Sequence, residues 1–166
     1  MGHDELVLND IYMFEKEYQI VNDRRSLGKP CTQVTDLNEG ARIGRLLLRE
    51  LAKHPNGVGL AANQIGIDAA VCVINAGRPV VLVNPVIKNT FEKIFFPEAC
   101  LSFPGEQITT QRWANIAVKA DNHEGILLFD KRNLLECVCV QHEVDHLAGI
   151  IMHEREIRLD NGRDIR

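Results

Sequence analysis

Hydrophobic residues between positions 36 and 53 recur every three or four residues, which is the spacing of one face of an amphipathic helix. Arginines occupy the opposite face, and Asp36 or Thr35 can cap the N-terminus by accepting a hydrogen bond from the first turn. The pattern therefore predicts a helix that ends near Lys53. Its apolar stripe consists of Ile43, Leu46, Leu47 and Leu51.

A second long helix is predicted to begin after Asn133, which can cap it. Glu136 stands at the capping-box position three residues later, and Gly149 is a natural stop. A shorter helix is predicted near Asp10–Tyr18. Helical spacing in the second helix relates Leu135, Val138, Cys139, His142 and His146.

The middle of the chain carries runs that are typical of strands. Residues 69–74 and 80–83 are apolar throughout, as in buried strands, and Gly77-Arg78-Pro79 separates them. A further strand is predicted over residues 86–96. The prolines that bracket residues 97–105 indicate a constrained loop or an edge segment.

Residues 116–120 and 126–129 have the pattern of a hairpin around a turn at 122–125. Many strands with two long helices far apart in the sequence favour an α+β fold, because a Rossmann-type sheet would need strands and helices in alternation. The sequence shows no repeat, low-complexity tract or linker, so we predict a single domain over residues 1–166.

The charge and composition exclude several kinds of partner. The chain has a formal net charge of -4, so non-specific binding to DNA or RNA has no electrostatic support. No apolar run approaches the ~20 residues of a membrane span, and the acidic start of the chain lacks secretory or transit features. An odd number of cysteines without such features indicates reduced thiols. We therefore expect a cytoplasmic protein with no membrane and no specific DNA partner.

The second helix contains the pattern H-E-x-x-H, formed by His142, Glu143 and His146. Residues four apart on a helix share a face, so the two imidazoles can bind one metal ion. Glu143 is rotated by about 100° from His142, which places its carboxylate beside the open position of the metal. A general base belongs at that place. The alternative is a helix that happens to carry two surface histidines.

A catalytic metal site needs a third protein ligand. Few residues follow His146, and Glu154 and Glu156 are too close to return on another helix, so an upstream ligand is favoured. Cys100 is the best candidate, because it lies in a proline-flanked segment beside the carboxylate of Glu98. The other cysteines fit less well: Cys137 points away from the histidine face, Cys139 suits a pocket wall, and Cys72 and Cys31 suit the core.

Three ordered motifs in the chain resemble those of the peptide deformylases. Residues 57–64 resemble the family's GxGLAAxQ motif, residues 98–102 its EGCLS motif and residues 141–147 its QHExDHL motif. The resemblance can be followed from Leu37 to about Met152. It implies an α+β fold, with antiparallel or mixed β-sheets packed around a central metal-binding helix. It also implies a hydrolase that removes the N-formyl group from the formyl-methionine of nascent polypeptides.

The resemblance assigns a role to each matching residue. It implies one metal ion per chain, Fe2+ with Zn2+, Ni2+ or Co2+ as substitutes, held by Cys100, His142 and His146. It makes Glu143 the general acid and base. Gln64 and the backbone N–H of Leu101 would bind the formyl oxygen, and Gly59 would pair with the extended substrate. The methionine pocket would include Val58, Phe96, Leu135, Val138 and Cys139.

The chain also departs from the family pattern. Ala99 replaces a glycine, and we expect it in the β region with Cys100 still binding metal. Gln107 stands where many bacterial members have a basic residue. The tail from His153 is shorter and more polar than the long helix that the family links to ribosome docking, which bears on any transient ribosome contact. A bacterial or phage-type enzyme fits better than an organellar one.

Two rival functions are distinguishable from this one. An H-E-x-x-H metalloprotease would take its third ligand from a Glu or His downstream of His146. A non-catalytic relative would keep the metal for structure or bind formyl-methionine chains without cleaving them. The presence of Glu143 and Gln64 argues against this second rival, because a structural site needs neither residue.

Overall fold

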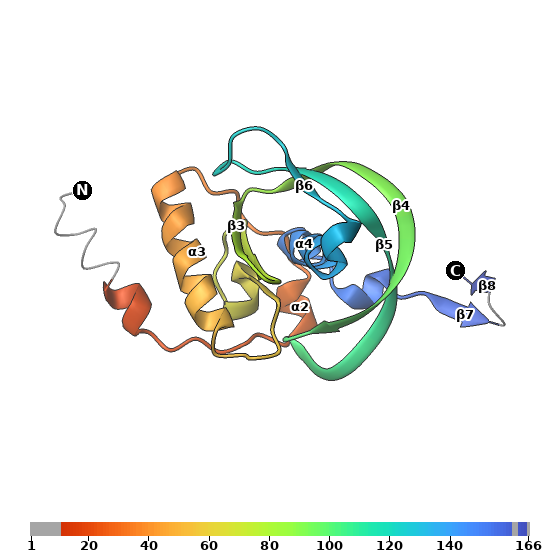
Figure 1. The fold of residues 1–166 in the computed structure, drawn as a ribbon. Helices are drawn as coiled ribbons and strands as arrows, with labels where there is room; N and C mark the ends of the chain where they lie inside the picture. The colour runs from red at the N-terminus through yellow and green to blue at the C-terminus, as the bar shows by residue number, and fades with distance from the viewer. Residues whose placement is uncertain (1–10, 161–162, 166) are drawn as a thin grey trace.

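The computed structural model describes residues 11–160 and 163–165, and it places helix α4 between two antiparallel sheets (Figure 1). The helices are α2 (Arg24–Leu27), α3 (Leu37–Leu51) and α4 (Leu134–Leu147), with 3-10 turns η1 (Ala62–Ile65), η2 (Lys131–Asn133) and η3 (Met152–Arg155). The strands are β1 (Gly59–Ala61), β2 (Val71–Asn75), β3 (Pro79–Val83), β4 (Val86–Cys100), β5 (Phe103–Lys119), β6 (Leu127–Phe129), β7 (Arg158–Asp160) and β8 (Arg163–Ile165).

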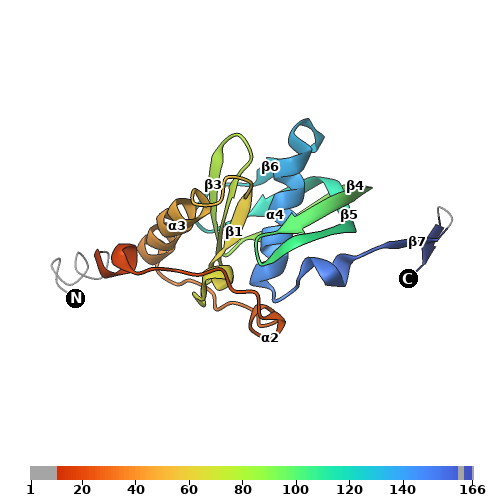
Figure 2. The same ribbon diagram turned by 90° about the horizontal axis from the view of Figure 1, so that it is seen from below.

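The strands form two main sheets and a small one. The first sheet has the order β1-β2-β3, the second has the order β4-β5-β6, and β7 pairs with β8. Figures 1 and 2 show the layers α3, first sheet, α4 and second sheet, with the long strands β4 and β5 curving around α4. The predicted α+β fold with sheets around a central helix is therefore confirmed.

The first sheet is buried on both faces, and its side chains alternate between two hydrophobic cores. Cys72 and Ile74 of β2 point into the core that includes α4, whereas Val71 and Val73 point into the core that includes α3. Such double burial explains why this stretch is apolar throughout, as the prediction for residues 69–74 requires. A third, smaller core surrounds Met152 and Cys100.

Both long helices begin and end where their capping residues predict. Asp36 caps α3 by accepting from the backbone N–H of Asn38, and Asn133 caps α4 by accepting from that of Glu136. Gly149 ends α4 with a φ of 76°, and a Cβ there would also lie 2.7 Å from the carbonyl oxygen of Gly28. Glycine is therefore required at this position both for its conformation and for its lack of a side chain.

The predicted limits of the second sheet were too narrow. Strand β4 continues to Cys100 and β5 already begins at Phe103, so most of residues 97–105 is strand with a turn at 101–102. The edge position of β4 tolerates Pro97, because an edge strand has backbone groups that need no partner. The first half of β5 was missed because polar residues alternate there with buried positions.

The remaining local predictions fall near the ends of the chain. Helical residues 11–15 lie within the short helix predicted near Asp10–Tyr18, and position 10 lies outside the described residues. The short helix α2 was not predicted. Ala99 belongs to β4 and lacks a positive φ, as expected. None of the helices formed by residues 11–160 is long and apolar enough to cross a membrane.

Candidate metal centre and substrate cavity

Cys100, His142 and His146 meet at the junction of β4 and α4, and all three are buried. Their ligand atoms lie within 4.8 Å of one another. The Nε2 atoms of the two histidines are 3.1 Å apart, and Cys100 Sγ lies 3.4 Å from His146 Nε2. Ligands about 2.0–2.3 Å from a tetrahedral ion are separated by roughly 3.3–3.8 Å. The 3.4 Å spacing fits one bound metal, and the 3.1 Å spacing between the imidazoles is slightly shorter.

The donor set also fits a metal chemically. Two imidazoles and one thiolate suit iron, zinc and neighbouring transition metals, and three protein ligands leave a position for water or substrate. Burial lowers the pKa of His146, and the nearby charge of Arg112 acts in the same direction. The imidazole of His146 therefore stays neutral, which is the form that binds a metal.

A buried network of charges orients His142. Its Nδ1 lies 2.7 Å from Glu98 Oε1, which directs Nε2 toward the other two ligands. Arg112 donates from Nη2 to Glu98 Oε1 at 2.9 Å and from Nη1 to Asp145 Oδ2 at 2.6 Å. Arg155 holds Asp145 from the other side. The network fixes the ring orientation that a metal ligand needs.

The network also keeps Glu98 ionised. Burial alone would raise the pKa of this carboxyl, but hydrogen bonds and charges from His142 and Arg112 lower it to about 2. The prediction had named Glu98 only as a neighbour of the cysteine, and it missed Arg112 and Asp145. Asp145 carried a weak signal, since it lies one turn from His142 on the same helix. The sequence around Arg112 has no pattern that indicates its part in this network.

Glu143 lies beside the ligands and is buried. Burial raises its pKa to about 7, despite the lowering effect of the charge on His142. Its Oε2 atom has no hydrogen-bond partner among the described residues, which leaves one carboxylate oxygen free for a water or a substrate. A carboxylate of this kind can accept or deliver a proton near neutral pH.

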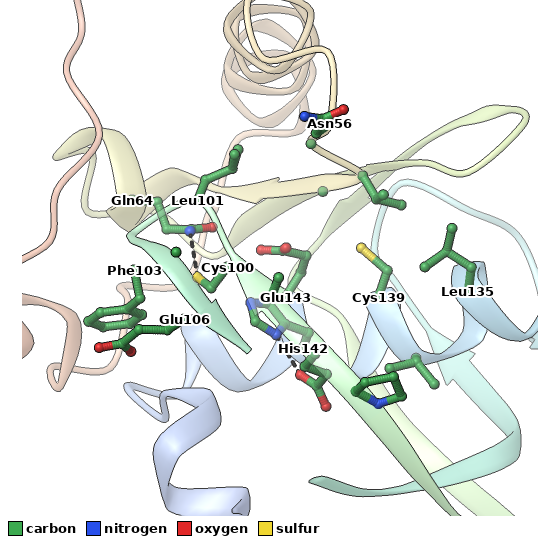
Figure 3. Close-up of a pocket in the computed structure, with 18 residues that line it drawn as sticks. Asn56, Gln64, Cys100, Leu101, Phe103, Glu106, Leu135, Cys139, His142 and Glu143 are labelled. Atoms are coloured by element: carbon green, nitrogen blue, oxygen red, sulfur yellow. Dashed lines mark hydrogen bonds and ion pairs between the residues drawn. The ribbon is translucent and has the colours of Figure 1, made fainter. Parts of the chain in front are cut away.

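Gln64 lies beside the metal ligands and contacts Cys100. Its Oε1 accepts from the backbone N–H of Ala61 at 2.9 Å, and its Nε2 donates to Ser102 Oγ at 3.1 Å. The same Nε2 donates to Cys100 Sγ at 3.5 Å (Figure 3). Because both amide ends are held, Nε2 points toward the metal site. The role of Ser102 in this arrangement was not predicted. Leu101, in the turn after Cys100, lines the same space.

A cavity of about 300 Å³ joins these groups. One end is apolar and contains the predicted residues Leu135, Val138 and Cys139. Val58 and Gly59 also line it, but Phe96 does not. Phe96 lies on β4 next to the lining residue Pro97, and its part in the methionine pocket stays a prediction.

Gly59 brings strand β1 against helix α4. A Cβ at this position would lie 2.5 Å from Cys139 Sγ and 2.7 Å from Glu143 Oε1. Only glycine leaves room for both side chains, so the strand can approach the general-base candidate closely. β1 is also an edge strand of its sheet, and Gly59 lines the cavity.

The other cysteines lie as the sequence predicted, with one exception. Cys139 lines the cavity, Cys72 is fully buried, and Cys137 points away toward the backbone carbonyl of Trp113. Burial raises the pKa of Cys137 to about 11. Cys31 is the exception, because it packs against the core but is itself only partly buried.

The fold and the site together define a class of protein, the metal-dependent hydrolases. Two histidines one turn apart and an upstream cysteine form the metal site, and a buried carboxylate lies beside it. Cys100 completes the ligand set among residues 11–160, so the downstream Glu or His of the metalloprotease alternative is not what the described chain uses.

Comparisons with known proteins identify the family. The polypeptide deformylase family profile matches residues 18–161. The peptide deformylase of Aquifex aeolicus is 40% identical over 146 residues, covering 82% of this chain and 85% of the relative. That of Neisseria meningitidis serogroup C is 35% identical over 144 residues, covering 83% of each. The crystal structure of a Synechococcus elongatus peptide deformylase in complex with actinonin superimposes with a TM-score of 0.75 and 31% identity, covering 86% of this chain and 79% of that one.

The chain belongs to the peptide deformylase family. It is a metallo-amidase that removes the N-formyl group from nascent peptides, and its Cys-His-His metal site is in place.

Proposed function

We propose that the metal is Fe2+, with Zn2+, Ni2+ or Co2+ as substitutes, and that the preferred substrate is a peptide beginning with formyl-methionine. The convergence of the three buried ligand atoms beside Glu143 carries the proposal. A divalent ion at this site would lower the pKa of a bound water to ~7, as good zinc sites do. The thiolate ligand is compatible with each of these metals.

Glu143 acts as the general base and then the general acid in this proposal. It takes a proton from the attacking water and delivers it to the nitrogen of the departing amine, so the C–N bond breaks and formate leaves. Burial raises the pKa of the Glu143 carboxyl, which supports its role as acceptor and donor of the proton. The unpartnered Oε2 atom is available for the transfer.

Gln64 and Leu101 stabilise the negative charge that develops on the formyl oxygen. The second hydrogen of the Gln64 amide nitrogen makes only the long 3.5 Å contact with Cys100 Sγ, which a formyl oxygen can replace, and the turn at Leu101 offers a backbone N–H. Both groups belong to segments that are held before substrate arrives, so little reorganisation is needed. That preorganisation is what makes such donors effective.

The substrate lies extended along β1, with its methionine side chain at the apolar end of the cavity. The edge position of β1 supports this arrangement, since an added strand can hydrogen-bond to an open edge. Leu135, Val138 and Cys139 supply an apolar surface that suits the methionine side chain. The formyl group is small, so a tight space beside the ligands excludes larger acyl groups.

The cellular setting follows from the substrate class. Nascent formylated chains are made in the cytoplasm, and we place the reaction there. We propose that any ribosome contact is transient; after His153 the described chain contains the rest of η3 and the β7–β8 pair. Co-sedimentation with translating ribosomes at low salt would measure that contact.

The proposal is tested by the Glu143→Gln variant, which keeps the shape of the side chain but cannot act as a base. We expect it to retain the metal and to release formate from a formyl-methionine peptide roughly 10²–10⁴-fold more slowly. The matched control is Glu124→Gln, an exposed glutamate in the turn between β5 and β6. Near-normal turnover by Glu143→Gln would remove this residue from the mechanism.

A further inference from the structure

We propose that Glu106 selects substrates that carry a lysine or arginine within the first residues after formyl-methionine. This inference rests on the proposed function, because it requires the peptide to lie in the cavity beside the metal ligands. It concerns a residue that none of the three family motifs includes and that the prediction of the site did not name.

Glu106 lines the end of the cavity that formyl-methionine leaves open. Figure 3 shows Phe103 and Glu106 on one side of Cys100 and Leu135 and Cys139 on the other. The formyl group is the N-terminus, so no residue precedes it, and the methionine side chain takes the apolar end. The residues that follow methionine are therefore the part of the substrate that remains to meet Glu106.

The carboxylate of Glu106 contacts His153 and forms no ion pair with a lysine or arginine among the described residues. No lysine or arginine lines the cavity among the described residues. The other two lining carboxyls are buried, and Glu98 is paired with Arg112. The Glu106 side chain is 47% exposed, so it can meet a cation on the substrate. An acidic residue at the same place would be repelled.

His153 holds the Glu106 carboxylate in position before a substrate arrives. Its Nε2 lies 2.5 Å from Glu106 Oε2, and its ring packs edge-on against Phe103 with the centroids 4.7 Å apart. Arg24 stacks over the same Phe103 ring, 5.5 Å from its centroid, and makes no ion pair with Glu106 within the described chain. A fixed carboxylate loses less side-chain freedom on binding than a mobile one, which favours recognition.

The test compares matched peptides with a basic or an acidic residue after methionine. The pairs are formyl-Met-Lys-Ala with formyl-Met-Glu-Ala, and formyl-Met-Ala-Lys with formyl-Met-Ala-Glu. In the unaltered protein we expect kcat/KM to favour the lysine peptide of at least one pair by roughly two- to five-fold, the size of an exposed ion pair. Glu106→Gln should bring that ratio close to one, and Glu106→Lys should invert it.

Glu124→Gln removes an equal charge far from the cavity and should leave the ratio unchanged. Added salt should shrink the ratio in the unaltered protein, because exposed charges are screened. If Glu106→Gln turns over all four peptides with the original ratios, the inference is wrong while the proposed function stands. If no peptide loses formate, the proposed function fails. The ratios of dissociation constants for the same peptides, measured by calorimetry with and without Glu106→Gln, then decide the inference.

Discussion

The two main sheets differ in how they are attached to helix α4. The sheet β1-β2-β3 is covered by α3 on one face and by α4 on the other, and its side chains are apolar on both faces. The sheet β4-β5-β6 curves around α4 and is joined to it partly by buried charges, with Arg112 of β5 between Glu98 and Asp145. One sheet is held by packing, and the other also by an ion network.

The difference shows that residues of the second sheet affect both the stability of the fold and the metal site. Ion pairs that are buried contribute little net stability when intact, but they cost much when one partner is removed. Here the same charges set the orientation of a metal ligand, since Glu98 contacts His142. The sheet β1-β2-β3 instead contributes the open edge of β1 and a rigid wall of the cavity. Changes in the two sheets should therefore have different consequences.

The largest effect is expected for Glu98→Gln in the second sheet. The variant leaves Arg112 buried with one fewer charge partner, so we expect a loss of about 3–5 kcal/mol in the free energy of unfolding. Metal affinity should fall by roughly 10–100-fold, because the acceptor for His142 becomes neutral. Denaturant unfolding and metal titration measure these two quantities.

Glu92→Gln is the control, because this glutamate is on the same strand but makes exposed contacts, an ion pair with Lys131 and a long hydrogen bond from Asn115. The loss in the free energy of unfolding for Glu92→Gln should stay below about 0.5 kcal/mol. Equal losses in the two variants would mean that the buried network has no special part in holding β4 to α4.

A smaller effect is expected for Gly44→Ala at the contact of α3 with the first sheet. Alanine normally favours a helix over glycine by about 1 kcal/mol. An added Cβ at Gly44 would overlap the side chain of Val81, however. We therefore expect overpacking to outweigh the helix preference and to lower the free energy of unfolding by about 1–3 kcal/mol. The double variant with Val81→Ala should recover part of the loss. A more stable single variant would contradict the packing account of this sheet.

The smallest effect is expected for Ala99→Gly in β4. Ala99 is extended, so glycine relieves no strain and weakens the strand by about 0.5–1 kcal/mol. Formate release should change little. Ala117→Gly in β5 is the control for the stability cost alone. If Ala99→Gly switched on an otherwise inactive chain, the natural protein would be a degenerate relative instead of a working enzyme.

The two sheets also differ in how well the sequence predicted them. Strands β2 and β3 were recognisable because both of their faces are buried and their residues are apolar throughout. Strand β5 was recognised only at its end, since Thr110 and Arg112 are polar residues that are nevertheless buried. Their burial depends on partners far away in the sequence, which no local pattern can indicate.

The candidate site was more predictable than the sheet that supports it. His142 and His146 are related by helix geometry alone, and the choice of Cys100 followed from the lack of downstream ligands. The surrounding groups were not predictable in this way. Ser102, Arg112 and Glu106 owe their positions to the hairpin of β4 and β5. The hairpin brings Glu106 to the cavity, and it brings Ser102 and Arg112 into contact with the lining residues Gln64 and Glu98.

The most direct test of the central claim is formate release from formyl-Met-Ala-Ser by the protein loaded anaerobically with Fe2+. We predict steady turnover with one metal per chain, its loss on chelation, and its return when the metal is restored. Cys100→Ala should lose both the metal and the activity, because two histidines alone bind a metal weakly. A protein that binds one metal through Cys100 and releases no formate with Fe2+, Zn2+, Ni2+ or Co2+ would contradict the account.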